Sequence, residues 1–210
     1  MFKYDRNSNV FEKIDTEEKA YWLGFLYADG YINEEHNFIT LGLAEKDKEH
    51  IEKFQSFLET DLPYQDRLNN GGYPCRFFRI SDKKLVKDLV NQGCKQNKSL
   101  TSKPDFEMND KFLIHWTRGL FDGDGSIYPN KENKIVRYRI NLCGTKEILL
   151  KVQEIWDIDR KLDFNRSIPK FVLCKKDEVN RILRLMYDEA TIYLNRKYEL
   201  AYKAIKQNLQ

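Results

Sequence analysis

The stretch WTRGLFDGDGSI, residues 116–127, combines small residues with carboxylates and ends abruptly. Gly119 and Gly123 stand four residues apart, on one face of a predicted helix, where they would let a second backbone approach closely. The glycines predict the end of the helix, which leaves Asp122 and Asp124 at its C-terminus. Because the helix dipole disfavours negative charge at that end, we expect a nearby cation to compensate.

The same arrangement occurs once more, upstream in the chain. Residues 22–32, WLGFLYADGYI, align with the first stretch at a constant offset of 95, which places Gly24, Ala28 and Asp29 opposite its small and acidic positions. If the two small-residue faces pack on each other, Asp29 and Asp124 lie side by side. Two carboxylates that close repel each other unless a divalent cation lies between or beside them. The repeat therefore predicts a metal site at the junction of two half-chains.

At these residues the chain resembles the LAGLIDADG family of homing endonucleases in its single-chain, two-motif form. The two copies read LGFLYADG, residues 23–30, and RGLFDGDG, residues 118–125. The resemblance implies an α+β fold of two pseudo-symmetric αββαββα repeats, with the motif helices packed at the centre and antiparallel β-sheets forming a DNA-binding saddle. The copies depart from the family's pattern at Arg118, which replaces a small residue, and at Tyr27, which replaces the first acid. These departures leave the tightness of the helix packing open.

The resemblance also implies an active site. Asp29 and Asp124 would be metal ligands and catalytic residues, while Lys98 and Lys197 would orient the hydrolytic water and offset charge in the transition state. The metal would be Mg²⁺, with Mn²⁺ able to substitute and Ca²⁺ able to bind without supporting cleavage. Four further positions would lie around the metal through a backbone carbonyl or the water network: Ala28, Gly123, Glu45 and Thr145.

Two plainer interpretations of the Asp-Gly pairs are a simple turn and a calcium loop. A single Asp-Gly pair would favour the turn, whereas two pairs at matched helix ends favour a metal site. A calcium loop that begins at Asp122 would need glycine and glutamate at positions that Ile127 and Asn133 occupy. The calcium-loop interpretation therefore fails.

Hydrophobic periodicity predicts the same order of elements in two halves, residues 1–100 and 101–210. In the first half we expect a motif helix that begins at a capping box of Asp15 and Glu18, a hairpin around residues 33–37, a helix at 47–59, strands at 64–68 and 75–80, and a helix around 85–90. In the second half we expect a motif helix after 109, strands at 126–129 and 136–143, a helix at 148–156, strands at 164–168 and 171–174, and helices around 179–186 and 192–207.

Positive charge gathers on the predicted strands, although the net charge of the 210 residues is only +3. A sheet whose lysines and arginines are mixed with Asn, Tyr and Ser suits the DNA major groove, where basic side chains meet phosphates and guanines. The plainer alternative is that exposed strands carry basic residues to block edge pairing. The candidate DNA contacts are Arg67, Arg76, Arg79, Lys131, Lys134, Arg137, Arg139, Arg166, Lys170 and Lys175.

Cysteine usage and hydropathy argue against several other classes. The four cysteines and three histidines are scattered, with no C-x-x-C pair, so we expect neither a zinc site nor a disulfide framework. The N-terminal MFKYDRNSNV lacks an apolar core, and no run of about 18 apolar residues occurs, so we expect no secretion signal and no membrane partner. The expected location is the cytoplasm of a bacterial or phage host, or an organellar matrix.

Together these observations favour a Mg²⁺-dependent, site-specific DNA endonuclease that hydrolyses one phosphodiester in each strand. The resemblance implies a monomer with an internal pseudo-two-fold, a long non-palindromic site, cleavage across the minor groove with 3′ overhangs, and intron homing. No intein splicing residues flank the chain, so we expect a free-standing or intron-encoded form. The alternatives are an intron maturase that acts on RNA and a DNA-binding regulator of the same fold that does not cleave. A purely structural protein would leave the paired acids and glycines unexplained.

Overall fold

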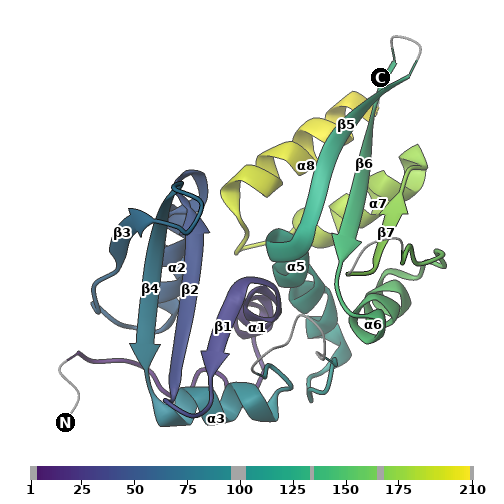
Figure 1. Ribbon diagram of the computed structural model, residues 1–210. Helices are drawn as coiled ribbons and strands as arrows, with labels where there is room; N and C mark the ends of the chain where they lie inside the picture. The colour runs from purple at the N-terminus through teal and green to yellow at the C-terminus, as the bar shows by residue number, and fades with distance from the viewer. Residues whose placement is uncertain (1–3, 96–102, 133–134, 165–167, 209–210) are drawn as a thin grey trace.

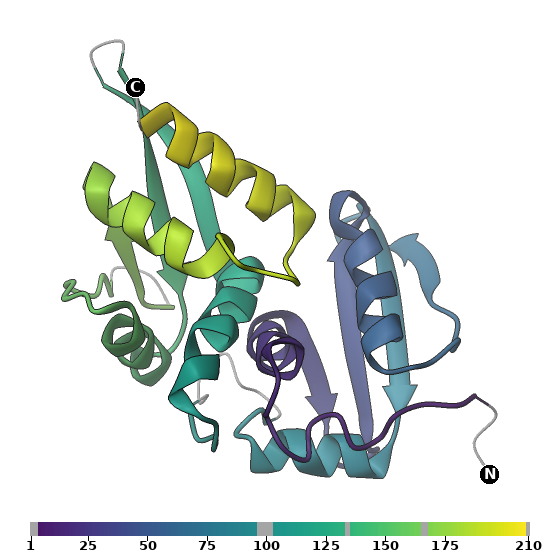
Figure 2. The ribbon, with the colours of Figure 1, turned by 180° about the vertical axis from the view of Figure 1, so that it is seen from behind.

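The computed structural model describes residues 4–95, 103–132, 135–164 and 168–208. Two antiparallel sheets flank a central pair of helices, and further helices cover one side of the sheets, the far side in Figure 1 and the near side in Figure 2. Among the described helices, none has the length and apolar character of a membrane span.

The elements follow the predicted order in both halves. The first half consists of α1 (Glu17–Asp29), β1 (Gly30–Asn33), β2 (Phe38–Ala44), the 3-10 helix η1 (Glu45–Asp47), α2 (Glu49–Phe57), β3 (Gln65–Leu68), β4 (Pro74–Ser81) and α3 (Lys83–Asn91). The second consists of η2 (Asp110–Phe112), α5 (Leu113–Asp124), β5 (Gly125–Glu132), β6 (Ile135–Cys143), α6 (Lys146–Trp156), β7 (Lys170–Leu173), α7 (Lys176–Tyr187) and α8 (Asn195–Asn208). The sheet orders are β1-β2-β4-β3 and β5-β6-β7. The predicted boundary between residues 100 and 101 lies outside the described residues.

The cap of α1 differs from the prediction by one residue. Thr16 caps the helix, because its extended backbone brings its Oγ1 within 3.2 Å of the Lys19 amide, which donates to it. Asp15 instead forms an ion pair with the Lys19 Nζ at 2.8 Å. In either arrangement, the negative charges of acidic residues in the first turn stabilise the helix through its dipole.

α1 and α5 pack through glycine, backbone against backbone. A Cβ atom added to Gly24 would lie 2.0 Å from the carbonyl oxygen of Trp116, and one added to Gly119 would lie 1.9 Å from the carbonyl oxygen of Tyr21. The two contacts are related by the same offset of 95 residues, so the crossing is two-fold symmetric. The predicted packing of the two small-residue faces is therefore confirmed.

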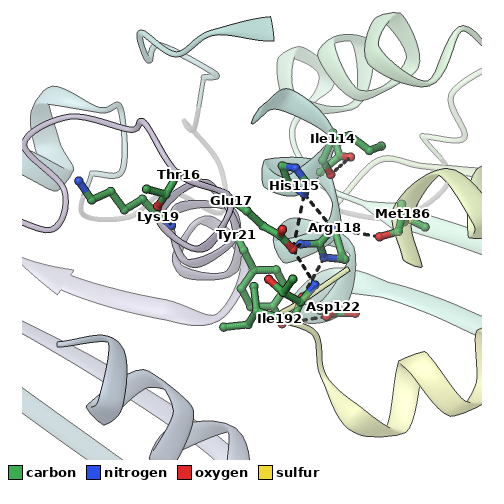
Figure 3. Close-up of polar contacts among 12 residues, drawn as sticks. Thr16, Glu17, Lys19, Tyr21, Ile114, His115, Arg118, Asp122, Met186 and Ile192 are labelled. Carbon is green, nitrogen blue, oxygen red and sulfur yellow. Dashed lines mark hydrogen bonds and ion pairs between the residues drawn. The ribbon is translucent and has the colours of Figure 1, made fainter. Parts of the chain in front are cut away.

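Behind this crossing, the buried carboxylate of Asp122 joins the two halves (Figure 3). It accepts hydrogen bonds from the Tyr21 hydroxyl of α1 at 2.8 Å, from the Tyr187 hydroxyl of α7 at 2.6 Å and from the Leu194 amide at 2.7 Å. His50 Nε2 lies 2.9 Å from the Tyr21 hydroxyl and donates to it, since that hydroxyl donates to Asp122. Burial lowers the pKa of His50 to about 3, which keeps the imidazole neutral, and burial raises the pKa of Asp122.

Arg118, which departs from the family's pattern, is 1% exposed and bridges the halves (Figure 3). Its guanidinium donates to the carbonyl oxygens of Ile192 and Met186 at 2.9 and 3.0 Å. It also pairs with the Glu17 carboxylate, in the first turn of α1, at 2.7 Å. The large side chain leaves the glycine contact intact and adds an ion pair between α1 and α5.

The structure describes only part of the chain between α6 and β7. The predicted strand at 164–168 lies mostly outside the described residues, and the described residues before it form a single bridge, between Asp163 and Lys170. The Gln153 side chain of α6 accepts from the Arg160 amide, just after the helix, at 2.6 Å and donates to the Arg160 carbonyl at 3.1 Å. These bonds hold the chain that leaves α6 against the end of that helix.

We predict that Gly119→Ala lowers the free energy of unfolding by about 3 kcal/mol, because the new methyl group would meet a backbone carbonyl that cannot move without separating the helices. Urea denaturation followed by tryptophan fluorescence measures the change. Gly144→Ala is the matched control, since its Cβ would lie 3.4 Å from the nearest atom, in Ile148, and should change stability by less than about 0.5 kcal/mol. Equal effects of the two variants would contradict the glycine crossing.

Asp122→Ala should cost about 3 kcal/mol or more, because it strands two buried hydroxyls and one amide without an acceptor. The same denaturation experiment measures this loss. Asp61→Ala, in the exposed loop between α2 and β3, removes an acid without these partners and should be nearly neutral. A neutral Asp122→Ala would show that the network does not hold the halves together.

Candidate active site and nucleic-acid interface

Asp29 and Asp124 are the last residues of α1 and α5, and both side chains are exposed. β1 and β5 begin at the next residue, so each acid stands at the corner between a central helix and a sheet. A Cβ atom added to Gly123 would lie 2.2 Å from the Ala28 Cβ and 3.3 Å from the Asp29 Oδ2. The Asp29 carboxylate therefore lies against the residue next to Asp124. The two acids thus stand at the neighbouring ends of the two packed helices, at the junction of the halves.

Lys197 provides the cation expected at the C-terminus of α5. Its side chain is only 3% exposed, and its ammonium donates to the carbonyl oxygens of Phe121 at 2.5 Å and Gly125 at 2.7 Å. A longer contact of 3.5 Å reaches the Gly123 carbonyl. These carbonyls belong to the last turn of the helix and the residue that follows it, where the dipole favours positive charge.

The charges around Lys197 tie it to both acids. Burial lowers the pKa of Lys197 to about 8, while the negative charges of Asp122, Asp29 and Asp124 raise it, and the positive charge of Arg196 lowers it further. The ammonium of Lys197 is thus within electrostatic reach of both exposed acids. It places positive charge at the C-terminus of α5, where Asp124 is the last residue.

A second set of contacts fixes the start of α8 to the first half. The Arg196 guanidinium forms two hydrogen bonds to the Asp47 carboxylate of η1, at 3.0 and 2.9 Å. The Lys53 ammonium of α2 donates to the Tyr193 carbonyl at 2.8 Å and to the Asn195 side chain at 2.7 Å. Sequence reasoning missed these contacts, because no local pattern connects residues that are about 140 positions or more apart.

Other predicted site residues have local partners or lie elsewhere. Lys98 lies outside the described residues. Glu45 is exposed on η1 and forms an ion pair with Lys48 at 2.6 Å. Thr145 is buried as the N-cap of α6, where its hydroxyl accepts from the Ile148 amide at 3.3 Å. Each of the two described side chains has a structural partner at its own helix terminus.

The donor set at the junction fits a cation that needs few protein ligands. Within the described residues no group of three or more His, Cys, Asp or Glu side chains could hold a metal ion. The pair of Asp29 and Asp124 instead suits Mg²⁺, which takes one or two carboxylates and completes its octahedron with waters and phosphate oxygens. A structural zinc site would require four closed ligands.

The first sheet has an open face, turned away from α2 (Figure 1). The strand registers place only some of its arginines on that face. Arg67 and Arg79 are exposed on the open face. Arg76 differs from the prediction, because the two-residue period of the strand turns it to the helix side. There it is 5% exposed and pairs with Asp66 at 2.8 Å and with Glu52 of α2 at 2.6 Å. Its charge is neutralised within the protein.

The second sheet presents another basic open face. Arg137 and Arg139 lie on it, two residues apart on β6, and the ladder places Lys170 of β7 on the same side. Lys131 is exposed near the end of the β5–β6 hairpin, on the alternate side of the strand. Lys175 is exposed in the turn before α7, outside the strands. Outside the described residues lie Lys134 and Arg166.

Sequence comparisons give distant relatives. No family model matches the chain. An uncharacterised protein of Methanocaldococcus jannaschii is 28% identical over 153 residues, which cover 70% of this chain and 56% of that protein. The DNA-directed RNA polymerase subunit Rpo1C of the same organism is 26% identical over 191 residues, which cover 82% of this chain and 22% of the subunit. The chain therefore spans about half the length of the first relative and about a fifth of the second.

Comparison with solved structures is more informative about the fold. The meganuclease I-SmaMI, bound to uncleaveable DNA, superposes with a TM-score of 0.62 at 13% identity, over 90% of this chain and 89% of that one. The LAGLIDADG meganuclease I-AabMI, bound to uncleaved DNA, gives 0.61 at 14% identity, over 89% of each chain. The LAGLIDADG homing endonuclease I-LtrWI, bound to target DNA, gives 0.59 at 12% identity, over 95% and 89%. The chain thus has the fold of the LAGLIDADG homing endonucleases.

Proposed function

We propose that this protein is a site-specific endonuclease that binds a long, non-palindromic stretch of double-stranded DNA and hydrolyses one phosphodiester in each strand. The observation that carries the proposal is the position of the Asp29 carboxylate against Gly123, the residue before Asp124, where the two packed helices end between two sheets with basic open faces. The solved structures of the same fold, several of them bound to DNA, support DNA as the partner. With both halves in one chain, the protein would act as a monomer.

In this proposal Asp29 and Asp124 hold Mg²⁺ or, in its place, Mn²⁺, whereas Ca²⁺ binds without supporting cleavage. When bound, the cation would polarise the phosphodiester and activate a water. Lys197 would offset the negative charge of the substrate, since its ammonium is held at the C-terminus of α5 by the carbonyls of Phe121 and Gly125. Lys98 would serve the equivalent position in the first half.

The two open sheet faces would each receive one half of the target. On the first sheet Arg67 and Arg79 would contact the DNA, and on the second sheet Arg137, Arg139 and Lys170 would. Arginine and lysine meet phosphates and base edges in the major groove. Because the two sets differ in residue and position, the two halves would contact different sequences, as a non-palindromic site requires.

We propose homing into an insertion-free copy of its own locus as the biological role.

A DNA-binding regulator or a maturase of the same fold would not require both acids. We therefore predict that Asp29→Asn and Asp124→Asn each reduce double-strand cleavage by about 100-fold or more, because the cation loses a ligand and its charge is less well balanced. The substrate is DNA that spans the gene's own insertion locus with the insertion removed, incubated with Mg²⁺. Binding, measured by gel shift, should stay within about threefold of wild type, since neither acid is expected to hold the duplex.

Asp61→Asn is the control for this experiment, because it removes one exposed negative charge far from the helix crossing, in the loop after α2. It should cleave at the wild-type rate. Wild-type cleavage by both site variants would remove these acids from the mechanism. A wild-type protein that binds the DNA without cutting it would instead favour the regulator.

Binding should also weaken steeply with salt. If the two open faces contact six or more phosphates, affinity falls by about 1,000-fold between 50 and 200 mM salt, because counterions are released on binding. Fluorescence anisotropy with a labelled duplex measures this dependence. A flat response would contradict the basic faces as the DNA-binding surface.

A further inference from the structure

Two arginines on the open face of the first sheet each lie over the ring of a phenylalanine. The guanidinium carbon of Arg79 lies 3.5 Å from the ring centroid of Phe38, and that of Arg67 lies 3.9 Å from the ring centroid of Phe77. Each pair is a diagonal neighbour across adjacent strands, as the ladder registers require. Cation–π contact of this kind fixes the plane of the guanidinium.

A glycine makes room for one of these rings. Gly42 pairs with Phe77 across β2 and β4, and a Cβ atom on Gly42 would lie 2.6 Å from the Phe77 ring. The Phe77 ring therefore lies against the backbone of Gly42, and the Arg67 guanidinium lies over the same ring. The other ring, Phe38, packs against an aromatic neighbour, since its centroid is 5.9 Å from that of Tyr31.

The stacked arginines keep their hydrogen-bonding edges for a partner. Within the described residues, neither Arg67 nor Arg79 donates a hydrogen bond or forms an ion pair with another side chain, although both are exposed. Arg76, on the same strand as Phe77, shows the contrast, since three of its nitrogens bind carboxylates. A guanidinium presents its N–H groups in its own plane, so stacking occupies its face and leaves the edge free.

A fixed guanidinium edge matches one base in particular. Guanine presents two acceptors, O6 and N7, to the major groove, and paired hydrogen bonds from arginine to both are the commonest specific contact. A phosphate contact would need only a mobile charge, which an unstacked side chain supplies equally well. Preorganised stacking therefore favours base recognition over charge neutralisation.

We propose that Arg67 and Arg79 each recognise one guanine, through O6 and N7, in the half of the target that the first sheet contacts. This inference rests on the proposed function. Thr40 pairs with both Tyr31 and Arg79, so the row that carries Arg79 begins two residues after Asp29. Arg67 lies on the outermost strand, opposite Cys75. The guanine recognised by Arg79 is therefore nearer to the cleavage point.

The test selects binding sites for the full chain from a library of randomised duplexes, in buffer with Ca²⁺ to hold cleavage back, followed by sequencing. Wild type should select a site with two such guanines in one half. Arg79→Lys and Arg67→Lys keep the charge but lose the paired donors, so each should lose about tenfold of the preference for guanine, at a different position. Preferences elsewhere in the site should be unchanged.

Phe77→Leu tests the stack itself, because it keeps Arg67 and removes the ring beneath it. It should weaken the same guanine preference as Arg67→Lys. Arg184→Lys, on the exposed side of α7, is the matched control and should leave every preference intact.

Uniform loss of affinity with all base preferences retained would show that these arginines contact phosphates, and would overturn the inference alone. If the wild type selects a site whose guanine preferences are unchanged by both Arg67→Lys and Arg79→Lys, the inference alone would also be overturned. A wild-type chain that selects no sequence at all would overturn the proposed function, and the inference with it.

Discussion

The rest of the structure depends on the direct contact between the backbones of α1 and α5 at Gly24 and Gly119. No side chain separates the helices there, so their crossing has almost no freedom to shift. Because each helix ends in an acid and a strand starts at the next residue, this one contact sets the positions of Asp29 and Asp124 and the direction in which each sheet leaves the centre. The candidate metal site and the two open faces are thus consequences of a single steric constraint.

Buried charge joins the halves beyond that contact, and it does so asymmetrically. Asp122 binds groups from α1, α7 and the segment before α8, and Arg118 adds an ion pair to the first turn of α1. The position equivalent to Asp122 in the first half is Tyr27, whose hydroxyl binds the carbonyls of Gln92 and Lys103 at 2.7 and 3.1 Å. In both halves this position anchors the chain that follows one helix, α3 in the first half and α7 in the second. An unpaired charge at such depth would be costly, so these partners must act together.

The arginines of the first sheet show how one residue type serves two purposes. Arg76 and Arg79 lie on the same strand. Arg76 is buried on the helix side, where it forms ion pairs, whereas Arg79 is exposed on the open face, over the ring of Phe38. The difference comes from the alternation of side chains along a strand, combined with acids that α2 and β3 bring to one face only. Charge that is neutralised internally supports the fold, and charge that is left on an open face is available to a polyanion.

The amino-acid sequence by itself determined the two-fold repeat, the order of helices and strands, the small residues of the crossing and the acids at its ends. These depend on local periodicity and on spacing, which the chain carries in order. Only the tertiary structure decided that Lys197 caps α5, that Arg118 and Asp122 bridge the halves, and that Arg76 faces inward. Each of these outcomes depends on partners brought together from distant or differently facing parts of the chain, for which no local pattern exists.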